Sequence, residues 1–176
     1  GKTFLSMRFL QLAEKEGFCW TVAAPTHKAV GVLQEALEKE GIKPTWHPST
    51  IHRLLRLKLK RERDLEICES TDQTASSLEQ VDLVLIDEAS MVSSSLLEII
   101  LSCANPFKTR VVFVGDSAQL PPVGEEKSPV FSIQNSLKAE LEEVVRHRGA
   151  VLGLASNFRE GGIPCKTPPC LPIIEK

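Results

Sequence analysis

The sequence predicts an α/β fold, in which a parallel β-sheet is flanked by helices. Two segments, 81–86 and 110–115, are apolar on both faces, as expected for strands at the centre of a covered sheet. Patterns with helical spacing precede and separate them, which predicts crossover connections. The 176 residues correspond to about one domain, and 42% of them are hydrophobic, as in an ordinary globular core.

The first elements follow from apolar spacing and from the residues that end helices. Residues 1–16 have a helical spacing of large apolar side chains, and Gly17 follows as a C-terminal cap. Aromatic and β-branched residues predict a strand over 18–24. A second helical pattern covers 29–37, and Gly41 ends it. The apolar residues of the first helix are Phe4, Leu5, Phe9 and Leu12.

The next part of the chain is less regular. Ser49 or Thr50 can cap a short helix over 51–55, which we expect to continue into a basic strip. Residues 64–80 are polar and predict an inserted loop or small hairpin that adds little to the core. The strand over 81–86 follows, and then a helix over 93–104 that Asn105 and Pro106 stop.

Beyond the strand over 110–115 the signals weaken. We expect a loop over 119–124, a short helix near Phe131, a strand over 141–145 and a helix over 150–158. The last sixteen residues hold four prolines and predict a loop or the start of another domain. These boundaries divide the chain into a domain over 1–149, with a small insertion at 58–80, and a linker or second domain over 150–176.

Charge is distributed unevenly, although the net charge is only −2. Six positive residues and one acid lie between Arg53 and Arg63, whereas 64–88 holds eight acids and neither Lys nor Arg. The basic strip is either a phosphate-contacting surface or a solvated helix face followed by an acidic loop. Its positive residues are Arg53, Arg56, Lys58, Lys60, Arg61 and Arg63.

Cysteine usage and apolar run lengths indicate the compartment. Five cysteines are an odd number scattered through a chain with its own core, which predicts reduced thiols in a cytosolic compartment. No apolar run approaches the roughly 20 residues of a membrane-spanning helix, so we expect no membrane association. Four residues separate Cys165 from Cys170 with no second pair nearby, which disfavours zinc.

The chain begins with Gly1-Lys2-Thr3, which matches the end of a phosphate-binding loop, G-x-x-x-x-G-K-[ST]. A helix N-terminus presents free N–H groups and a partial positive charge to phosphates. Alone, such a tripeptide arises easily by chance. Asp87 and Glu88 directly follow a buried strand, where one carboxylate can bind a metal and the other can activate water, or where the pair can cap a helix. The two elements together favour a nucleotide site.

Three further segments resemble a known family in both sequence and order. They read APTHKAV at 24–30, STIHRLL at 49–55 and VGDSAQLPPV at 114–123, and DEAS at 87–90 lies between the last two. The set resembles the first motor domain of superfamily 1 DNA helicases of the RecD-like and Dda-like branch, over residues 1 to about 160. This resemblance implies a RecA-like P-loop fold and ATP and Mg²⁺ as cofactors.

The resemblance implies a role for each matching residue of the nucleotide site. Glu88 would be the general base, Gln119 would sense the γ-phosphate, and Arg146 would stabilise charge on the transferred phosphoryl group. His147 follows Arg146 where many relatives have glutamine, so Arg148 remains an alternative. The residues that would bind nucleotide are Gly1, Lys2, Thr3, Asp87 and Asp116, with Thr3 and Asp87 on the metal.

The resemblance also implies single-stranded DNA as a partner. Hydroxyls, backbone N–H groups and positive charge would contact phosphates, and His27 or His52 could stack on a base. A histidine on a helix is also compatible with a purely structural place. Trp46, flanked by prolines, could stack on a base, although packing is the favoured interpretation. The implied DNA-binding residues are Pro25, Thr26, His27, Lys28, Ser49, Thr50, His52 and Arg53.

Some parts of the family pattern have no counterpart in this sequence. They are the first strand, most of the phosphate loop and a second motor domain. We therefore expect a fragment of a longer ATP-dependent helicase or translocase, moving 5′ to 3′ and working with replication, repair or recombination proteins. The strand over 111–114 should lack a neighbour, and the isolated chain should hydrolyse ATP weakly or not at all. The alternatives are an ATPase switch that unwinds nothing and a non-catalytic DNA-binding remnant.

Overall fold

The structure is a computed structural model that describes residues 1–62, 65–134 and 136–141. The chain forms two compact units, one over 2–136 and the other comprising Gly1 with 137–176. All helices and strands of the described residues lie in the unit over 2–136. That unit is therefore the subject of the description that follows.

A parallel sheet forms the centre of this unit, as predicted. It contains β1 (Trp20–Ala24), β2 (Ser49–Thr50), β5 (Leu83–Ile86) and β6 (Arg110–Phe113), in the order β2-β1-β5-β6. The register pairs Ala23 with Ile86, and Ile86 with Phe113. The carboxyl ends of the three longer strands therefore lie at the same edge of the sheet.

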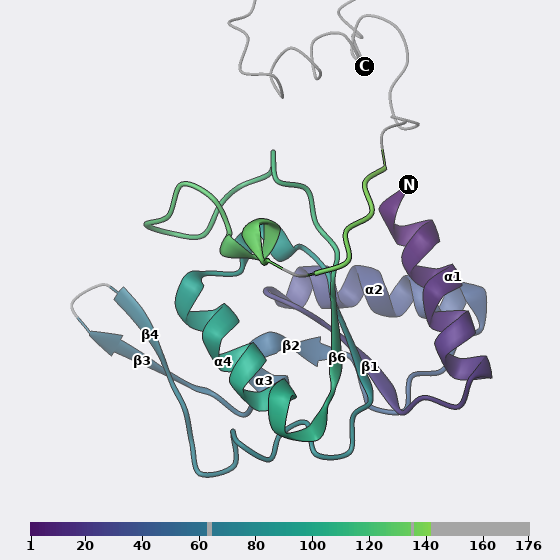
Figure 1. The fold of residues 1–176 in the computed structure, drawn as a ribbon, viewed down its shortest axis with the longest axis horizontal. Coiled ribbons are helices and arrows are strands. Elements are labelled where there is room, and N and C mark those ends of the chain that lie inside the picture. Colours follow the sequence, from purple (N-terminus) through teal and green to yellow (C-terminus); the bar gives the residue numbers. More distant parts are fainter. Residues whose placement is uncertain (63–64, 135, 142–176) are drawn as a thin grey trace, which may run out of the picture. The chain divides into compact units, whose positions relative to one another are not determined.

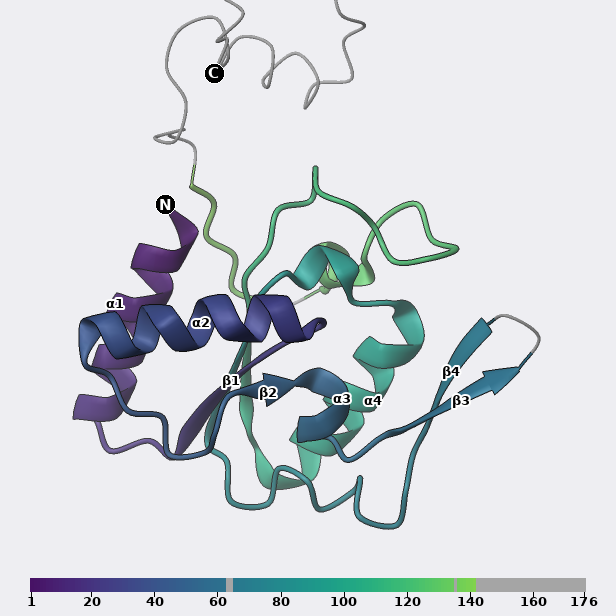
Figure 2. The same ribbon diagram turned by 180° about the vertical axis from the view of Figure 1, so that it is seen from behind.

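Helices cover both faces of the sheet, which gives three layers (Figures 1 and 2). Helices α1 (Lys2–Lys15) and α2 (His27–Glu40) pack on one face, and α3 (Ile51–Leu54) and α4 (Ser94–Ala104) pack on the other. Short 3₁₀ helices lie at η1 (Ala89–Met91), η2 (Asn105–Phe107) and η3 (Pro129–Ser132). The parallel sheet flanked by helices is the RecA-like α/β arrangement that the sequence predicted.

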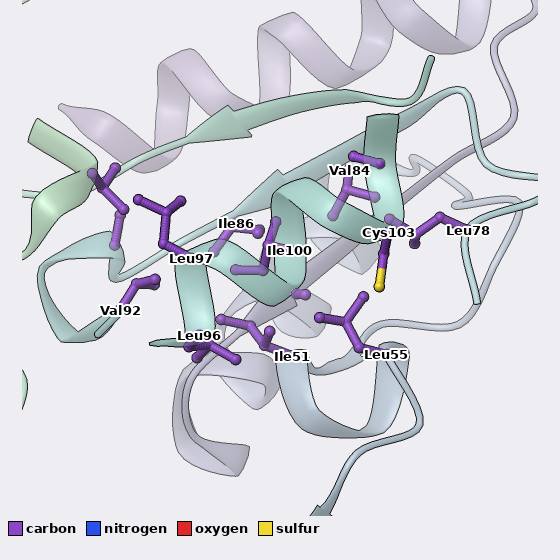
Figure 3. Close-up of a cluster of buried hydrophobic side chains, with 14 of the residues drawn as sticks. Ile51, Leu55, Leu78, Val84, Ile86, Val92, Leu96, Leu97, Ile100 and Cys103 are labelled. Atoms are coloured by element: carbon purple, nitrogen blue, oxygen red, sulfur yellow. The ribbon is translucent and has the colours of Figure 1, made fainter. Parts of the chain in front are cut away.

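Strand β5 shows why its sequence is apolar at every position. Leu83 and Leu85 face the core beneath α1 and α2, whereas Val84 and Ile86 face the core beneath α3 and α4. Figure 3 shows Val84 and Ile86 among side chains of α3 and α4 in the second core. A strand that is buried on both faces needs an unbroken apolar run rather than an alternating one.

The predicted glycine caps are confirmed. Gly17 and Gly41 have φ values of 77° and 67°, in the left-handed region that glycine adopts without a steric penalty. After Gly41, the Ile42 N–H donates to the Leu37 carbonyl at 3.0 Å, which closes the helix with the hydrogen bond of a Schellman motif.

The basic strip does not continue α3, contrary to the prediction. Arg56 has a φ of 54°, and the Leu57 N–H donates to the His52 carbonyl at 2.8 Å. This is the same helix-ending motif without a glycine, so the sequence carried no signal for it. The strip instead enters β3 (Lys58–Glu62), which pairs with β4 (Leu65–Glu69) in an antiparallel hairpin.

The segment after the hairpin contributes more to the core than predicted. Leu78 is almost fully buried and packs beneath α3 and α4, as Figure 3 shows. The Thr109 hydroxyl, which is also buried, donates to the Val81 carbonyl at 2.8 Å. One apolar residue in a polar stretch gives only a weak periodic signal, so the burial of Leu78 could not be predicted from the sequence.

Helix α1 and strand β6 border surfaces that remain open in the described residues. The apolar residues that identified α1 in the sequence are exposed, and the helix buries Met7, Leu10 and Ala13 instead. Strand β6 pairs with β5 alone among the described strands, and its side chains are less buried than those of β5. Among the described strands, the edge at 111–114 therefore has no second neighbour.

Some of the other predicted elements are present, and some fall on residues that the structure does not describe. Helix α4 and the short helix near Phe131 are present as predicted, and Thr50 is the cap of α3. The predicted strand over 141–145, apart from its first residue, the helix over 150–158 and the C-terminal tail lie outside the described residues. Within the described part, no helix has the length and apolarity needed to cross a membrane.

Candidate active site and groove

The first turn of α1 lies at the edge of the sheet where the strands end. Helix α1 has 14 residues, a length of about 21 Å, and a short turn connects it to the start of β1. Its N-terminus must therefore lie near the carboxyl ends of the strands. In Figure 1 the start of α1 and the loop after β6 both lie at the upper end of the sheet. Lys2 and Thr3, both half-buried, occupy this first turn.

The acid pair follows β5 at the same edge. The Asp87 N–H donates to the Ala23 carbonyl at 2.9 Å, which extends the pairing with β1 by one residue. Glu88 then has φ 54° and ψ 42°, a left-handed conformation that is strained for a residue with a side chain. The two carboxylates are half-buried. The abrupt end of the strand thus places two acids at the edge where α1 begins.

The segment after β6 lies close against the segment after β5, which carries the acid pair. The Ala89 N–H donates to the Val114 carbonyl at 3.0 Å. A Cβ on Gly115 would lie 3.1 Å from the Ala89 Cβ and 3.2 Å from the Phe131 ring. A side chain at this position would fit only if its neighbours moved by a few tenths of an ångström. Gly115 therefore holds the segment after β6 against the segment after β5.

Asp116 organises the turn that carries Gln119. Its carboxylate accepts the Ala118 N–H at 3.1 Å, and its carbonyl accepts the Gln119 N–H at 3.0 Å. Gln119 is exposed at this turn, near the carboxyl end of β6. The geometry agrees with a supporting role for Asp116, since the aspartate folds the turn through its own backbone and side chain.

The far end of this loop is attached to α4. The Glu125 carboxylate accepts the Ser94 N–H at 2.8 Å and the Ser94 hydroxyl at 2.9 Å. A carboxylate at this place satisfies a free N–H of the helix and opposes the positive end of the helix dipole. The contact of Glu125 could not be predicted from the sequence, because two residues 31 positions apart leave no local pattern.

A groove of about 670 Å³ lies beside the β2 edge of the sheet. Figure 2 shows α2, β2 and α3, three of the elements that border it, side by side. Its lining comes from α2, from 46–50, from α3 with the turn after it, and from 76–81. Among its polar lining residues are His27, Gln34, His47, Ser49, Arg53 and Arg56.

Half of the predicted DNA-binding residues line this groove. They are His27, Ser49, Thr50 and Arg53. The hydroxyls of Thr26 and Thr50 accept N–H groups of Ala29 and Arg53, at 3.2 Å and 3.3 Å, so both serve as helix caps.

The other predicted residues lie outside the lining or outside the described chain. Pro25, Thr26 and Lys28 precede or begin α2 without lining the groove. The His52 Nε2 lies 3.1 Å from the Cys68 Sγ, so this ring faces the hairpin. Arg146 and its alternative Arg148 lie outside the described residues. Gly1 belongs to the other compact unit.

A protein-family model and curated relatives match the part of the chain that contains these motifs. The AAA domain family matches residues 1–166. The chain is 30% identical over 167 residues to the ATP-dependent DNA helicase dda of Enterobacteria phage T4, which covers 92% of this chain and 36% of that protein. It is 33% identical over 168 residues to the ATP-dependent RecD2 DNA helicase of Deinococcus radiodurans, which covers 93% and 21%.

A solved structure supports the fold independently. Bacteroides Pif1 bound to ssDNA is similar over 89% of this chain and 40% of that chain, with a TM-score of 0.57 and 22% identity. The chain spans well under half the length of the curated relatives named above. Because the family match covers nearly the whole chain and includes each of the quoted motifs, the chain belongs to the AAA domain family.

Proposed function

We propose that this domain hydrolyses ATP and couples hydrolysis to movement along single-stranded DNA, as part of a DNA helicase or translocase. The observation that supports the proposal is that two motifs distant in sequence stand at helix and strand ends on the same edge of the sheet. Lys2 and Thr3 begin α1 there, and Asp87 and Glu88 end β5 there. Nucleotides commonly bind at this edge of open α/β sheets.

The residues of this edge suit the phosphates of ATP. The N-terminal turn of α1 offers free N–H groups and the Lys2 ammonium to the triphosphate. Glu88 is suited to orient the attacking water and accept its proton. Gln119, on the turn that Asp116 holds, is suited to respond to loss of the γ-phosphate. Arg146 is retained as the residue that stabilises transferred charge.

Mg²⁺ fits the donor set of this site. The Thr3 hydroxyl and the Asp87 carboxylate are oxygen ligands, which Mg²⁺ prefers. No cluster of three or more His, Cys, Asp or Glu side chains forms a metal site within the described residues. This agrees with an ion that uses one or two protein ligands together with substrate phosphates. When bound, Mg²⁺ would neutralise charge on the phosphates.

The groove supports single-stranded DNA as the second ligand. Arg53 and Arg56 offer charge to phosphates, and His27 and Ser49 offer polar contacts to phosphate or base. The groove begins next to the residues that follow β1, and the acid pair follows the neighbouring strand β5. Motion 5′ to 3′ and a role in replication, repair or recombination belong to the same proposal, by resemblance to the family.

The domain organisation is part of the proposal. We assign 1–149 to the motor domain, with 58–80 as an insertion that contains the β3–β4 hairpin. Residues 150–176 are assigned to a linker or to the start of a second motor domain. Such a domain would supply the remaining contacts to ATP.

The test measures DNA-stimulated ATP hydrolysis in the longest protein that the gene encodes. We expect Lys2→Ala to weaken ATP binding at least tenfold. We expect Glu88→Gln to keep ATP binding but to lower hydrolysis about 10²-fold to 10⁴-fold, the usual contribution of a general base. Lys15→Ala, at the other end of α1, and Glu98→Gln, exposed on α4, are matched controls that should hydrolyse ATP normally.

The outcomes separate the proposal from its alternatives. Hydrolysis that single-stranded DNA does not stimulate would favour an ATPase switch. DNA binding without nucleotide binding would favour a non-catalytic remnant. Normal hydrolysis by Glu88→Gln would contradict the assignment of the base. Strand separation from a labelled fork, lost in both site variants, would support the helicase form of the proposal.

A further inference from the structure

The two tryptophans of the chain occupy opposite environments. Trp20 begins β1 and is 1% exposed, whereas Trp46 is 43% exposed and lines the groove. Structural tryptophans are usually well buried, because the indole ring has the largest apolar surface of any side chain. Packing alone therefore does not account for the position of Trp46.

The main chain of Trp46 is nevertheless held firmly. Its N–H donates to the Trp20 carbonyl at 3.3 Å, and its carbonyl accepts the Thr21 hydroxyl at 3.0 Å. The neighbouring Thr45 exchanges hydrogen bonds with Trp20, at 3.1 Å through its N–H and at 3.2 Å through its hydroxyl. An exposed ring on a fixed backbone loses little conformational entropy when a ligand covers it.

Charged and polar side chains line the same groove as the ring. Arg53 and Arg56 line the same groove, and Glu79 is the one acid in its described lining. His47, next in sequence, has its Nδ1 3.4 Å from the Gln34 amide nitrogen and 3.2 Å from the Pro48 carbonyl oxygen. A groove that contains both an aromatic face and positive charge suits a ligand with flat rings and phosphates.

We propose that Trp46 is a stacking platform for a base of single-stranded DNA in this groove. The inference rests on the proposed function and adds the residue that contacts a base rather than a phosphate. Stacking on an aromatic ring is tolerant of sequence because every base has a π-face. The inference thus predicts binding with little sequence preference at this position.

The first test uses the intrinsic fluorescence of the unmodified chain. Trp20 is shielded, so a change that DNA causes by direct contact reports on Trp46. We expect an oligo(dT) strand to quench the emission. An abasic strand of the same length, which has phosphates but no bases, should bind more weakly and cause little quenching. Binding of oligo(dT) with no quenching would overturn the stacking role.

The second test compares variants at this position. Trp46→Ala should weaken oligo(dT) binding about 5-fold to 150-fold, the range that corresponds to one stacked base. Trp46→Phe should restore most of that loss. Val32→Ala, which removes an exposed apolar side chain of α2 outside the groove lining, is the matched control and should bind normally. Far-UV circular dichroism checks that each variant is folded.

The two proposals fail in distinguishable ways. If Arg53→Ala weakens DNA binding and lowers its salt dependence while Trp46→Ala binds like the unmodified chain, the stacking role is wrong and the DNA-binding groove stands. If the unmodified chain binds no single-stranded DNA, both proposals are wrong. Loss of binding in Trp46→Ala that the abasic strand shares equally would also overturn stacking, because phosphates would then account for it.

Discussion

At the scale of single residues, the strained backbone of Glu88 is the clearest sign of a functional constraint. A left-handed conformation costs a residue with a side chain about 1 to 2 kcal/mol, and Glu88 retains it at φ 54°. Hydrogen bonds on both sides enforce this geometry, through the N–H groups of Asp87 and Ala89.

Replacing Glu88 should separate stability from activity. We expect Glu88→Gly to raise the free energy of unfolding by about 1 kcal/mol relative to Glu88→Ala, since only alanine keeps the steric penalty. Urea denaturation of both variants measures the difference. Neither variant should hydrolyse ATP. Equal stability of the two would show that the backbone is not strained in solution.

The close approach at Gly115 gives a second prediction at this scale. Gly115→Ala should lower the free energy of unfolding by about 1 to 3 kcal/mol, because the new methyl group overlaps Ala89 and Phe131. Gly31→Ala is the matched control. Gly31 lies inside α2 with open space at its Cβ position, so alanine there should stabilise by up to about 1 kcal/mol. Similar urea midpoints for the two variants would refute the close approach.

At the scale of elements, loops that carry site residues are attached to helix ends. The loop after β6 begins with the turn of Asp116 and ends where Glu125 binds the N-terminus of α4. Ser93 caps the same helix by accepting the Leu96 N–H at 3.3 Å. The loop therefore has two fixed ends around Gln119, which limits where this side chain can move.

Removing the charge of Glu125 should loosen this attachment. We expect Glu125→Gln to lower the free energy of unfolding by about 1 kcal/mol, because the bond from the Ser94 N–H loses its charged acceptor. Glu126→Gln, at the exposed next position, should change stability by less than about 0.5 kcal/mol. Thermal unfolding of both variants in the same buffer provides the comparison.

At the scale of the whole unit over 2–136, burial is uneven across the sheet. Strands β1 and β5 are buried at every position, whereas β6 is only half-buried and lies at the edge. The N–H groups of Arg110, the first residue of β6, and Val114, the residue after β6, donate to the carbonyls of Asp82 and Ile86, both at 2.8 Å. The direction of the backbone N–H groups alternates along a strand. The N–H of Val112 therefore also points toward β5, whereas the N–H groups of Val111 and Phe113 point to the open side.

Amide hydrogen exchange should show this alternation directly. We expect the Val111 and Phe113 amides to exchange faster than those of Val112 and Val114 in the same strand. The four amides are consecutive along the chain, so the Val112 and Val114 amides serve as the control for the Val111 and Phe113 amides. Equal, strong protection of Val111 and Phe113 would mean that a further strand, from another segment or a second copy, covers the edge.

Much of this architecture could be predicted because its signals are local. Apolar spacing identified α1, α2 and α4, and the glycines after α1 and α2 marked their ends. Other ends had no such mark. Arg56 and Lys108 close their helices in the left-handed conformation without glycine, at φ 54° and 56°, so only the folded chain reveals where these helices stop.

The burial of α1 shows why the remainder needed the structure. The helix carries large apolar residues on more than one face, so its periodicity does not identify the face that packs on the sheet. Contacts with β1 and β5 select Met7, Leu10 and Ala13, and leave Phe4 and Leu12 exposed. Residues distant in sequence therefore determine which face of α1 is buried.

The sequence alone determined the order of the elements and the residue types at the strand ends, since hydrophobic period and turn chemistry act over a few neighbours. The order of its motifs also gave the resemblance to helicase motor domains. Only the tertiary structure decided that Glu125 binds α4 and that Trp46 faces a groove, because both depend on segments that the fold brings together. Such contacts arise from the packing of layers, which no local pattern encodes.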